Sequence, residues 1–323
     1  MGSMKSLPGW VGARLLIVRG IASLISCCFA SVAVGQSSSP WSGVLENYFQ
    51  ATRPTQGLAF SESWLEVRDR ISSNWRAIIT YDYTPGDFTF DANYLEYDQP
   101  DMYVRLGRFR SDFGFGQWSD TNYNVEIADP LIRQDPILPG LGLNRLDIGA
   151  EVQKNFGQWQ VTVSDLDVDT GPVQMQPEDM NWQQGRLQTQ VGQVILGANG
   201  LVKQFSPLSH SGSMYSADFR WTTTQLIARG EFVRGAAPGF STEGYYVDLS
   251  YRLPGLFRTE LGARNEAYDV LGSGQRTSLT TVGVRQIVGS SVTLNLNYAF
   301  GTAFGDFSTM PGWSFEAVYF VHF

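Results

Sequence analysis

The chain has 323 residues, of which 43% are hydrophobic, 13% aromatic and 17% charged, with a formal net charge of −8. This length suits one large domain or two ordinary ones, and the acidic balance excludes a basic nucleic-acid-binding protein. No stretch after residue 40 has the 18 or more uninterrupted apolar residues of a membrane-spanning helix.

The first 35 residues differ in composition from the rest of the chain. Lys5, Arg14 and Arg19 precede a short apolar run, and no acidic residue occurs before Gln36. A positive region, an apolar region and small residues at 33–35 predict a secretory signal peptide over residues 1–35. A buried or anchoring N-terminal helix is the alternative, but the run is short for a membrane span.

Both cysteines, Cys27 and Cys28, lie within this predicted signal peptide. Its removal takes away three of the 23 Lys and Arg and none of the 31 Asp and Glu, which leaves a net charge of −11. The exported chain, residues 36–323, then has no cysteine. Without disulfides, it needs a large core or another source of stability.

Apolar residues recur at every second position along the remaining chain. The stretches 74–83, 146–153, 245–252 and 292–300 alternate in this way, and no convincing amphipathic helix is found. The alternating stretches are about ten residues long, as tilted membrane strands are, and aromatic residues end their apolar rows. Because a strand edge cannot stay unpaired in a bilayer, we expect an all-β, antiparallel transmembrane β-barrel.

A long connection without a clear period spans residues 111–144. It follows the stretch "VRLGRFRSDFGFGQWSD" (104–120), which is similar to a segment of general porins of the Gram-negative outer membrane. Gly107, Arg108, Phe113 and Gly114 match that segment, whereas Asp112 stands where many relatives have Pro. The resemblance implies that this third loop folds into the barrel and narrows it.

Residue types at this predicted constriction indicate a transverse field. A pore selects solutes by its diameter and by the charges that line it. The alternation places three wall arginines inward, and the loop supplies five carboxylates. The predicted constriction comprises Arg68, Arg76, Arg105, Asp112, Asp120, Glu126, Asp129 and Asp135. The alternative is that arginines and carboxylates pair with each other and fill the lumen, or that the loop lies outside.

Two other sets of polar residues carry weaker hypotheses. Asp165, Asp167, Asp169, Glu178 and Asp179 cluster near one loop, but they lack calcium-loop spacing, so a solvated acidic loop is expected and no metal site is predicted. The only histidines are His210 and His322. Neither stands in a recognisable catalytic arrangement, so we expect neither an enzyme nor a cofactor.

The last segment, "WSFEAVYFVHF" (313–323), alternates as well and ends on an aromatic residue. It resembles the final strand of Gram-negative outer-membrane barrels. That resemblance implies that Phe315, Tyr319, Val321 and Phe323 form a signal read by the barrel-assembly machinery, and that this strand closes the barrel against the first.

Short turns and long loops alternate consistently when sixteen strands are counted, with a turn at "GANG" (197–200). Counts of fourteen or twelve strands are the alternatives. Sixteen strands leave an aqueous channel. We therefore expect a porin that is exported through the periplasm to the outer membrane of a Gram-negative bacterium and passes small hydrophilic solutes.

The resemblance further implies a homotrimer in contact with membrane lipids and lipopolysaccharide. The alternative function is that of a filled-lumen barrel acting as an adhesin, a structural anchor or a membrane-embedded hydrolase.

Overall fold

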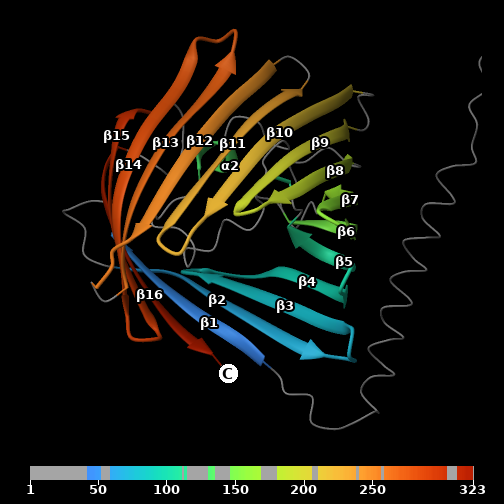
Figure 1. Cartoon of the computed structure of the whole chain (residues 1–323), viewed down its shortest axis with the longest axis horizontal. Coiled ribbons are helices and arrows are strands. Elements are labelled where there is room, and N and C mark those ends of the chain that lie inside the picture. Colours follow the sequence, from blue (N-terminus) through green and yellow to red (C-terminus); the bar gives the residue numbers. More distant parts are fainter. Residues whose placement is uncertain are drawn as a thin grey trace, which may run out of the picture.

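The computed structural model describes residues 42–51, 59–110, 113–114, 130–134, 146–168, 180–205, 210–237, 240–255, 258–303 and 311–322. The predicted signal peptide, residues 1–35, lies outside them. In the described part, sixteen antiparallel strands form one closed barrel in which each strand pairs with its chain neighbours and β1 pairs with β16 (Figure 1). The sequence prediction of a sixteen-stranded antiparallel barrel is confirmed.

The element bounds are as follows: β1 Ser42–Ala51, β2 Ala59–Arg70, β3 Trp75–Thr84, β4 Asp87–Gln99, β5 Met102–Arg110, α2 Leu131–Gln134, β6 Leu146–Phe156, β7 Trp159–Val168, β8 Met180–Val191, β9 Val194–Phe205, β10 His210–Thr222, β11 Leu226–Ala237, β12 Phe240–Arg252, β13 Thr259–Leu271, β14 Gln275–Val288, β15 Val292–Thr302 and β16 Gly312–His322. No helix among these residues is long and apolar enough to span a membrane.

Alternate residues of each strand face opposite sides of the wall, as the period of two requires. On β7, Val163 is 57% exposed, whereas its neighbours Thr162 and Ser164 are only 2% and 1% exposed. We call the residues that face the barrel axis the inner row and the others the outer row. The outer rows are largely apolar and exposed, and the inner rows carry most of the buried charged side chains.

Aromatic side chains of the outer rows gather near both ends of the barrel. Trp75 and Tyr97 pack 5.0 Å apart, ring centre to ring centre, near one end. Tyr298 and Trp313 pack 4.7 Å apart near the other. This is the arrangement of aromatic girdles at two membrane interfaces.

The two ends of the barrel differ in the length of their connections. Residues 71–74, 100–101, 157–158, 192–193, 223–225, 253–258 and 289–291 form short connections at one end, called here the turn end. The opposite loop end carries the longest connection, residues 111–145. The connections at 238–239 and 272–274 also lie at the loop end, but they are short, unlike the longer loops expected from sequence.

One expected turn is wrong. The stretch 197–200 ("GANG") lies within β9, and the chain turns instead at Gly192, whose φ of +62° suits glycine. Gly197 belongs to an inner row, where an added Cβ would lie 2.5 Å from an Asp218 carboxylate oxygen and 2.6 Å from Arg186 Nη2. This glycine makes room for an ion pair and does not form a turn.

Candidate functional site: the inner wall of the barrel

Charged residues of both signs line the inner wall, and most of them are buried. The inner rows include Asp147, Glu151, Arg186, Asp218, Arg229, Glu231, Asp248, Arg264, Glu266, Arg285 and Glu316, each of which is less than 9% exposed. The alternation along each strand places these side chains on the same face of the wall. Charges buried at this level are stable only when paired or hydrogen-bonded.

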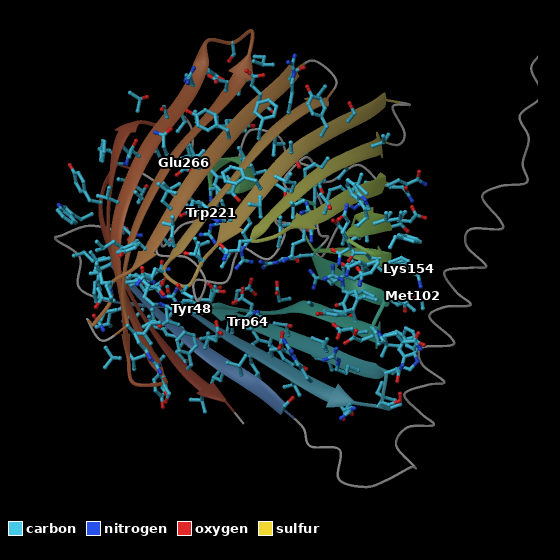
Figure 2. The ribbon with its side chains drawn as sticks, viewed as in Figure 1. Tyr48, Trp64, Met102, Lys154, Trp221 and Glu266 are labelled. Carbon is cyan, nitrogen blue, oxygen red and sulfur yellow. The ribbon has the colours of Figure 1, made fainter. Side chains whose placement is uncertain are left out.

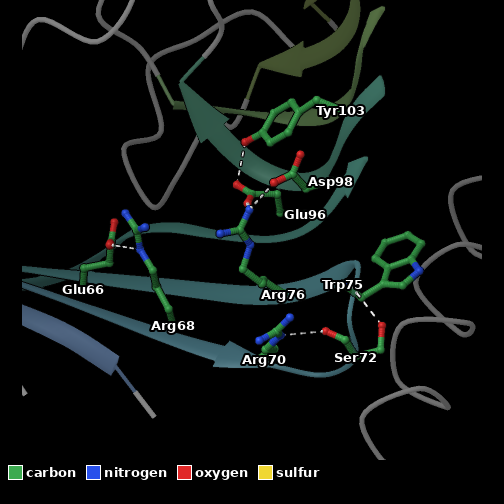
Figure 3. A network of polar contacts seen from close by, with 9 residues as sticks. All are labelled: Glu66, Arg68, Arg70, Ser72, Trp75, Arg76, Glu96, Asp98 and Tyr103. Carbon is green, nitrogen blue, oxygen red and sulfur yellow. Dashed lines mark hydrogen bonds and ion pairs between the residues drawn. The ribbon is translucent and has the colours of Figure 1, made fainter. Parts of the chain in front are cut away.

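Arg68 and Arg76 lie on neighbouring strands and contact carboxylates of the same wall (Figure 3). Arg76 Nη2 lies 2.7 Å from Glu96 Oε1 and 2.8 Å from Asp98 Oδ2. Arg68 forms an ion pair with Glu66 and keeps half of its side chain exposed. These two guanidiniums therefore remain partly accessible, although each already has a carboxylate partner.

Arg105 is more deeply enclosed. Its Nε donates to Glu151 Oε1 over 3.0 Å, and Ser164 Oγ donates to the other oxygen of Glu151 over 2.9 Å. The guanidinium carbon also lies 4.7 Å from the ring centre of Phe109 and 5.7 Å from that of Tyr103. A pair with a buried carboxylate and two aromatic contacts holds this side chain in one position.

A second polar network crosses β8 to β10. Arg186 donates to both carboxylate oxygens of Asp218, over 2.6 and 3.0 Å, and to Asn199 Oδ1 over 3.0 Å. Asn199 in turn donates to Ser216 Oγ over 2.7 Å. Since the bidentate pair spans three strands, it ties the wall together laterally.

Two pieces of the long connection 111–145 are described, and both are buried. Phe113, Leu131 and Ile132 pack with inner-row residues such as Trp182 and Tyr268 in one apolar cluster. The segment α2 lies against β12 and β13, inside the barrel in Figure 1.

Two contacts fix α2 at that wall. The backbone N–H of Leu131 donates to Glu266 Oε2 over 2.7 Å. At Gly244, an added Cβ would lie 2.5 Å from Ile132 Cγ2, so a larger residue there would require the Ile132 side chain to move or shrink. The described part of the connection therefore occupies the lumen side of β12 and β13.

The loop carboxylates of the predicted constriction, Asp112, Asp120, Glu126, Asp129 and Asp135, lie outside the described residues. Arg68, Arg76 and Arg105 lie on the inner wall of β2, β3 and β5, where their partners are wall carboxylates. The opposition of loop carboxylates to wall arginines stays a prediction.

The described residues of the predicted assembly signal share one face of β16. Phe315, Tyr319 and Val321 belong to its outer row, and Tyr319 is 46% exposed. Phe323 lies outside the described residues. β16 pairs with β1 over Phe315 to His322, so it is the strand that closes the barrel.

Other polar candidates are dispersed. Asp165 and Asp167 lie in the outer row of β7, where Asn181 donates to Asp167 over 3.1 Å. Asp169, Glu178 and Asp179 lie outside the described residues. His210 begins β10 at the loop end, and His322 ends β16 at the turn end. Within the described ranges, no group of three or more His, Cys, Asp or Glu could hold a metal ion.

At the turn end, Lys154 of β6 contacts Asp101 in the connection between β4 and β5. Hydrogen bonding and the positive charge of this ammonium hold the pKa of Asp101 below its usual value. Because the pair is exposed, it adds little to stability.

Sequence reasoning missed one region of the inner wall. Trp64 of β2 faces the lumen, and its Nε1 lies 3.5 Å from Asp91 Oδ2. Asp91 reaches this position because the pairing of β3 with β4 shifts between Ile79 and Tyr81, a β-bulge that the sequence pattern does not reveal. The alternation of β3 could have revealed Asp82, which shares the phase of Arg76.

The fold is similar to those of solved outer-membrane proteins. A trimer form of OmpT, an outer membrane protein of Vibrio cholerae, aligns with a TM-score of 0.58 and 12% identity over 88% of this chain and 98% of that one. An anion-selective porin from Comamonas acidovorans aligns with a TM-score of 0.61 and 12% identity over 89% of this chain and 100% of that one. OmpF of Salmonella typhi, in complex with daunomycin, aligns with a TM-score of 0.60 and 7% identity over 88% of this chain and 97% of that one.

No protein-family model and no curated protein matches the sequence. At identities of 7–12%, the structural likenesses establish the fold alone.

Proposed function

We propose that the chain forms a water-filled channel of the outer membrane, through which small hydrophilic solutes diffuse passively. The observation that carries the proposal is the closure of sixteen strands around a charged inner wall. A barrel of this size is too wide for wall side chains alone to fill it. Charged inner rows also need water or partners, since lipid offers neither.

The docking of α2 adds support, because it covers only one side of the lumen. The described part of the long loop packs on β12 and β13. On the opposite side, Arg68 and Arg76 retain 51% and 37% of their side-chain exposure. A constriction formed by the loop, with Asp112, Asp120, Glu126, Asp129 and Asp135 facing the wall arginines, belongs to this proposal.

The likeness to porins supports the same assignment, and the proposal extends to location and assembly. The protein would be exported by a signal peptide over residues 1–35, inserted by the barrel-assembly machinery and surrounded by lipids and lipopolysaccharide. The OmpT comparison is described as a trimer form, which supports a homotrimer here. The proposed function involves no enzymatic activity.

A second candidate is a barrel with a filled lumen that serves as an adhesin, an anchor or a hydrolase. One observation favours it: several inner-wall charges are paired with each other and buried, among them Arg105 with Glu151 and Arg229 with Asp248. When the charged side chains of the wall pair with each other, fewer charges remain accessible to a solute in the lumen.

Conductance in planar lipid bilayers separates the two candidates. The refolded protein, with its barrel verified by circular dichroism, should produce discrete current steps in potassium chloride. A porin of known conductance, inserted under the same conditions, is the positive control. If the verified barrel inserts into the bilayer but conducts no current under conditions in which the control porin conducts, the channel assignment is wrong. That result would favour the barrel with a filled lumen.

A further inference from the structure

The loop half of the barrel has two unlike inner walls. On β7 to β14 the wall is apolar and covered: Leu166, Trp182, Leu201 and Leu279 are each no more than 2% exposed, and they belong to the cluster that holds α2. On β2 and β3, Glu62, Trp64 and Asp82 of the inner rows remain partly exposed. Among the described residues, the more open side of this half of the lumen therefore runs along β2 and β3.

Trp64 occupies the centre of that open wall. In register, it stands between Glu46 of β1 and Asp82 of β3. Along its own strand, its inner-row neighbours are Glu62 and Glu66. With Asp91, which lies beside the indole nitrogen, five carboxylates surround one partly exposed indole: Glu46, Glu62, Glu66, Asp82 and Asp91.

An apolar cluster packs beside the indole. Trp64 packs against a cluster of three buried side chains, Tyr48, Val318 and Phe320, at the seam between β1 and β16. Figure 2 shows Tyr48 and Trp64 on this wall. These three side chains are buried, so they support the indole from the side, and the partly exposed indole is the apolar surface that a solute would meet.

Among the described residues, two arginines contact members of this set of five carboxylates. Arg68 pairs with Glu66, and Arg110 Nη2 lies 3.3 Å from Asp91 Oδ1. Glu62 and Asp82 lie close to each other, and Arg110 is an electrostatic partner of both carboxyl groups. In the part of the chain that the structure describes, negative groups therefore outnumber positive groups around the indole.

We propose that this surface, named here the Trp64 strip, binds organic cations that carry an aromatic or alkyl group. Its exposed part comprises Glu62, Trp64 and Asp82, and the buried side chains of Tyr48, Val318 and Phe320 support the indole. The indole attracts the cation through its negative face, and tryptophan is the side chain best suited to this. The carboxylates add Coulombic attraction, and the indole removes part of the apolar group of the solute from water. The inference rests on the proposed channel for access and names its preferred solute class.

Calorimetric titration of the folded protein in detergent tests the strip. Benzyltrimethylammonium is the probe, and benzenesulfonate is the matched anion. We expect saturable binding of the cation and none of the anion. Trp64→Leu should weaken cation binding roughly ten-fold, and the double variant Glu62→Gln/Asp82→Asn should weaken it at least as much. Equal binding of cation and anion, or an unchanged Trp64→Leu titration, overturns the proposal.

Trp221→Leu is the control, because Trp221 is an exposed outer-row residue of β10. It should bind the cation as the unsubstituted protein does, and thermal unfolding should confirm that each variant is folded. The titration does not depend on conductance. If the barrel binds the cation but passes no current, the Trp64 strip is supported and the channel proposal is wrong. If the barrel conducts but does not bind the cation, only the proposal of the Trp64 strip is wrong.

Discussion

At the scale of single residues, the environment of an ion pair decides its contribution to stability. Glu151 is fully buried beneath Arg105 and also accepts from Ser164. Glu66 pairs with Arg68, whose side chain is half exposed to solvent. Losing one partner of a buried pair leaves a charge without compensation, whereas an exposed partner regains water.

We therefore expect Glu151→Ala and Glu66→Ala to differ strongly. The first should lower the free energy of unfolding by about 3–5 kcal/mol, the usual cost of breaking a buried pair. The second should cost about 1 kcal/mol or less. Urea unfolding of the barrel in lipid vesicles, followed by tryptophan fluorescence, measures both. Equal losses would show that water reaches Glu151 as readily as Arg68.

At the scale of elements, the strands could be predicted from alternation, and the turns less well. The inward phase of Asp147, Glu151 and Asp248 follows from a period of two. "GANG" has the composition of a turn, yet its Gly197 serves the pair between Arg186 and Asp218, which come from β8 and β10. No local pattern reports a contact between strands that are not neighbours in the sheet.

The loop segment α2 could not be placed from its residues. Its position depends on Glu266, more than a hundred residues away, and on the bare backbone at Gly244. The expectation that the loop enters the barrel came from a resemblance to porins and not from the pattern of the loop. The β-bulge that brings Asp91 beside Trp64 could not be predicted either, because it depends on how β4 pairs with β3.

Cross-linking tests the docking of α2. Ile132→Cys together with Gly244→Cys should form a disulfide on mild oxidation, because the two side-chain positions are in contact. The chain without residues 1–35 has no other cysteine. The same loop cysteine paired with Ala263→Cys, in the exposed outer row of β13, is the control and should not cross-link. Equal cross-linking of both pairs, or none in the first, would place α2 elsewhere.

At the scale of the whole molecule, closure of the sheet gives every strand two neighbours and separates two environments. The outer rows present exposed residues such as Val163, Leu296 and Phe300, and the inner rows hold the charges. The sequence could predict this division, because it depends only on alternation. It could not predict the unequal walls of the lumen, because those depend on which strands the loop covers.

A nitroxide scan along β15 in lipid vesicles tests this division most directly. Labels at Leu294, Leu296, Tyr298 and Phe300, all in the outer row, should be highly accessible to molecular oxygen, which concentrates in lipid. Labels at Asn295, Asn297 and Ala299, in the inner row, should be much less accessible to it. The account predicts oxygen accessibility that alternates with a period of two. Uniform accessibility along the strand, or outer-row labels that a water-soluble nickel chelate reaches equally well, would contradict it.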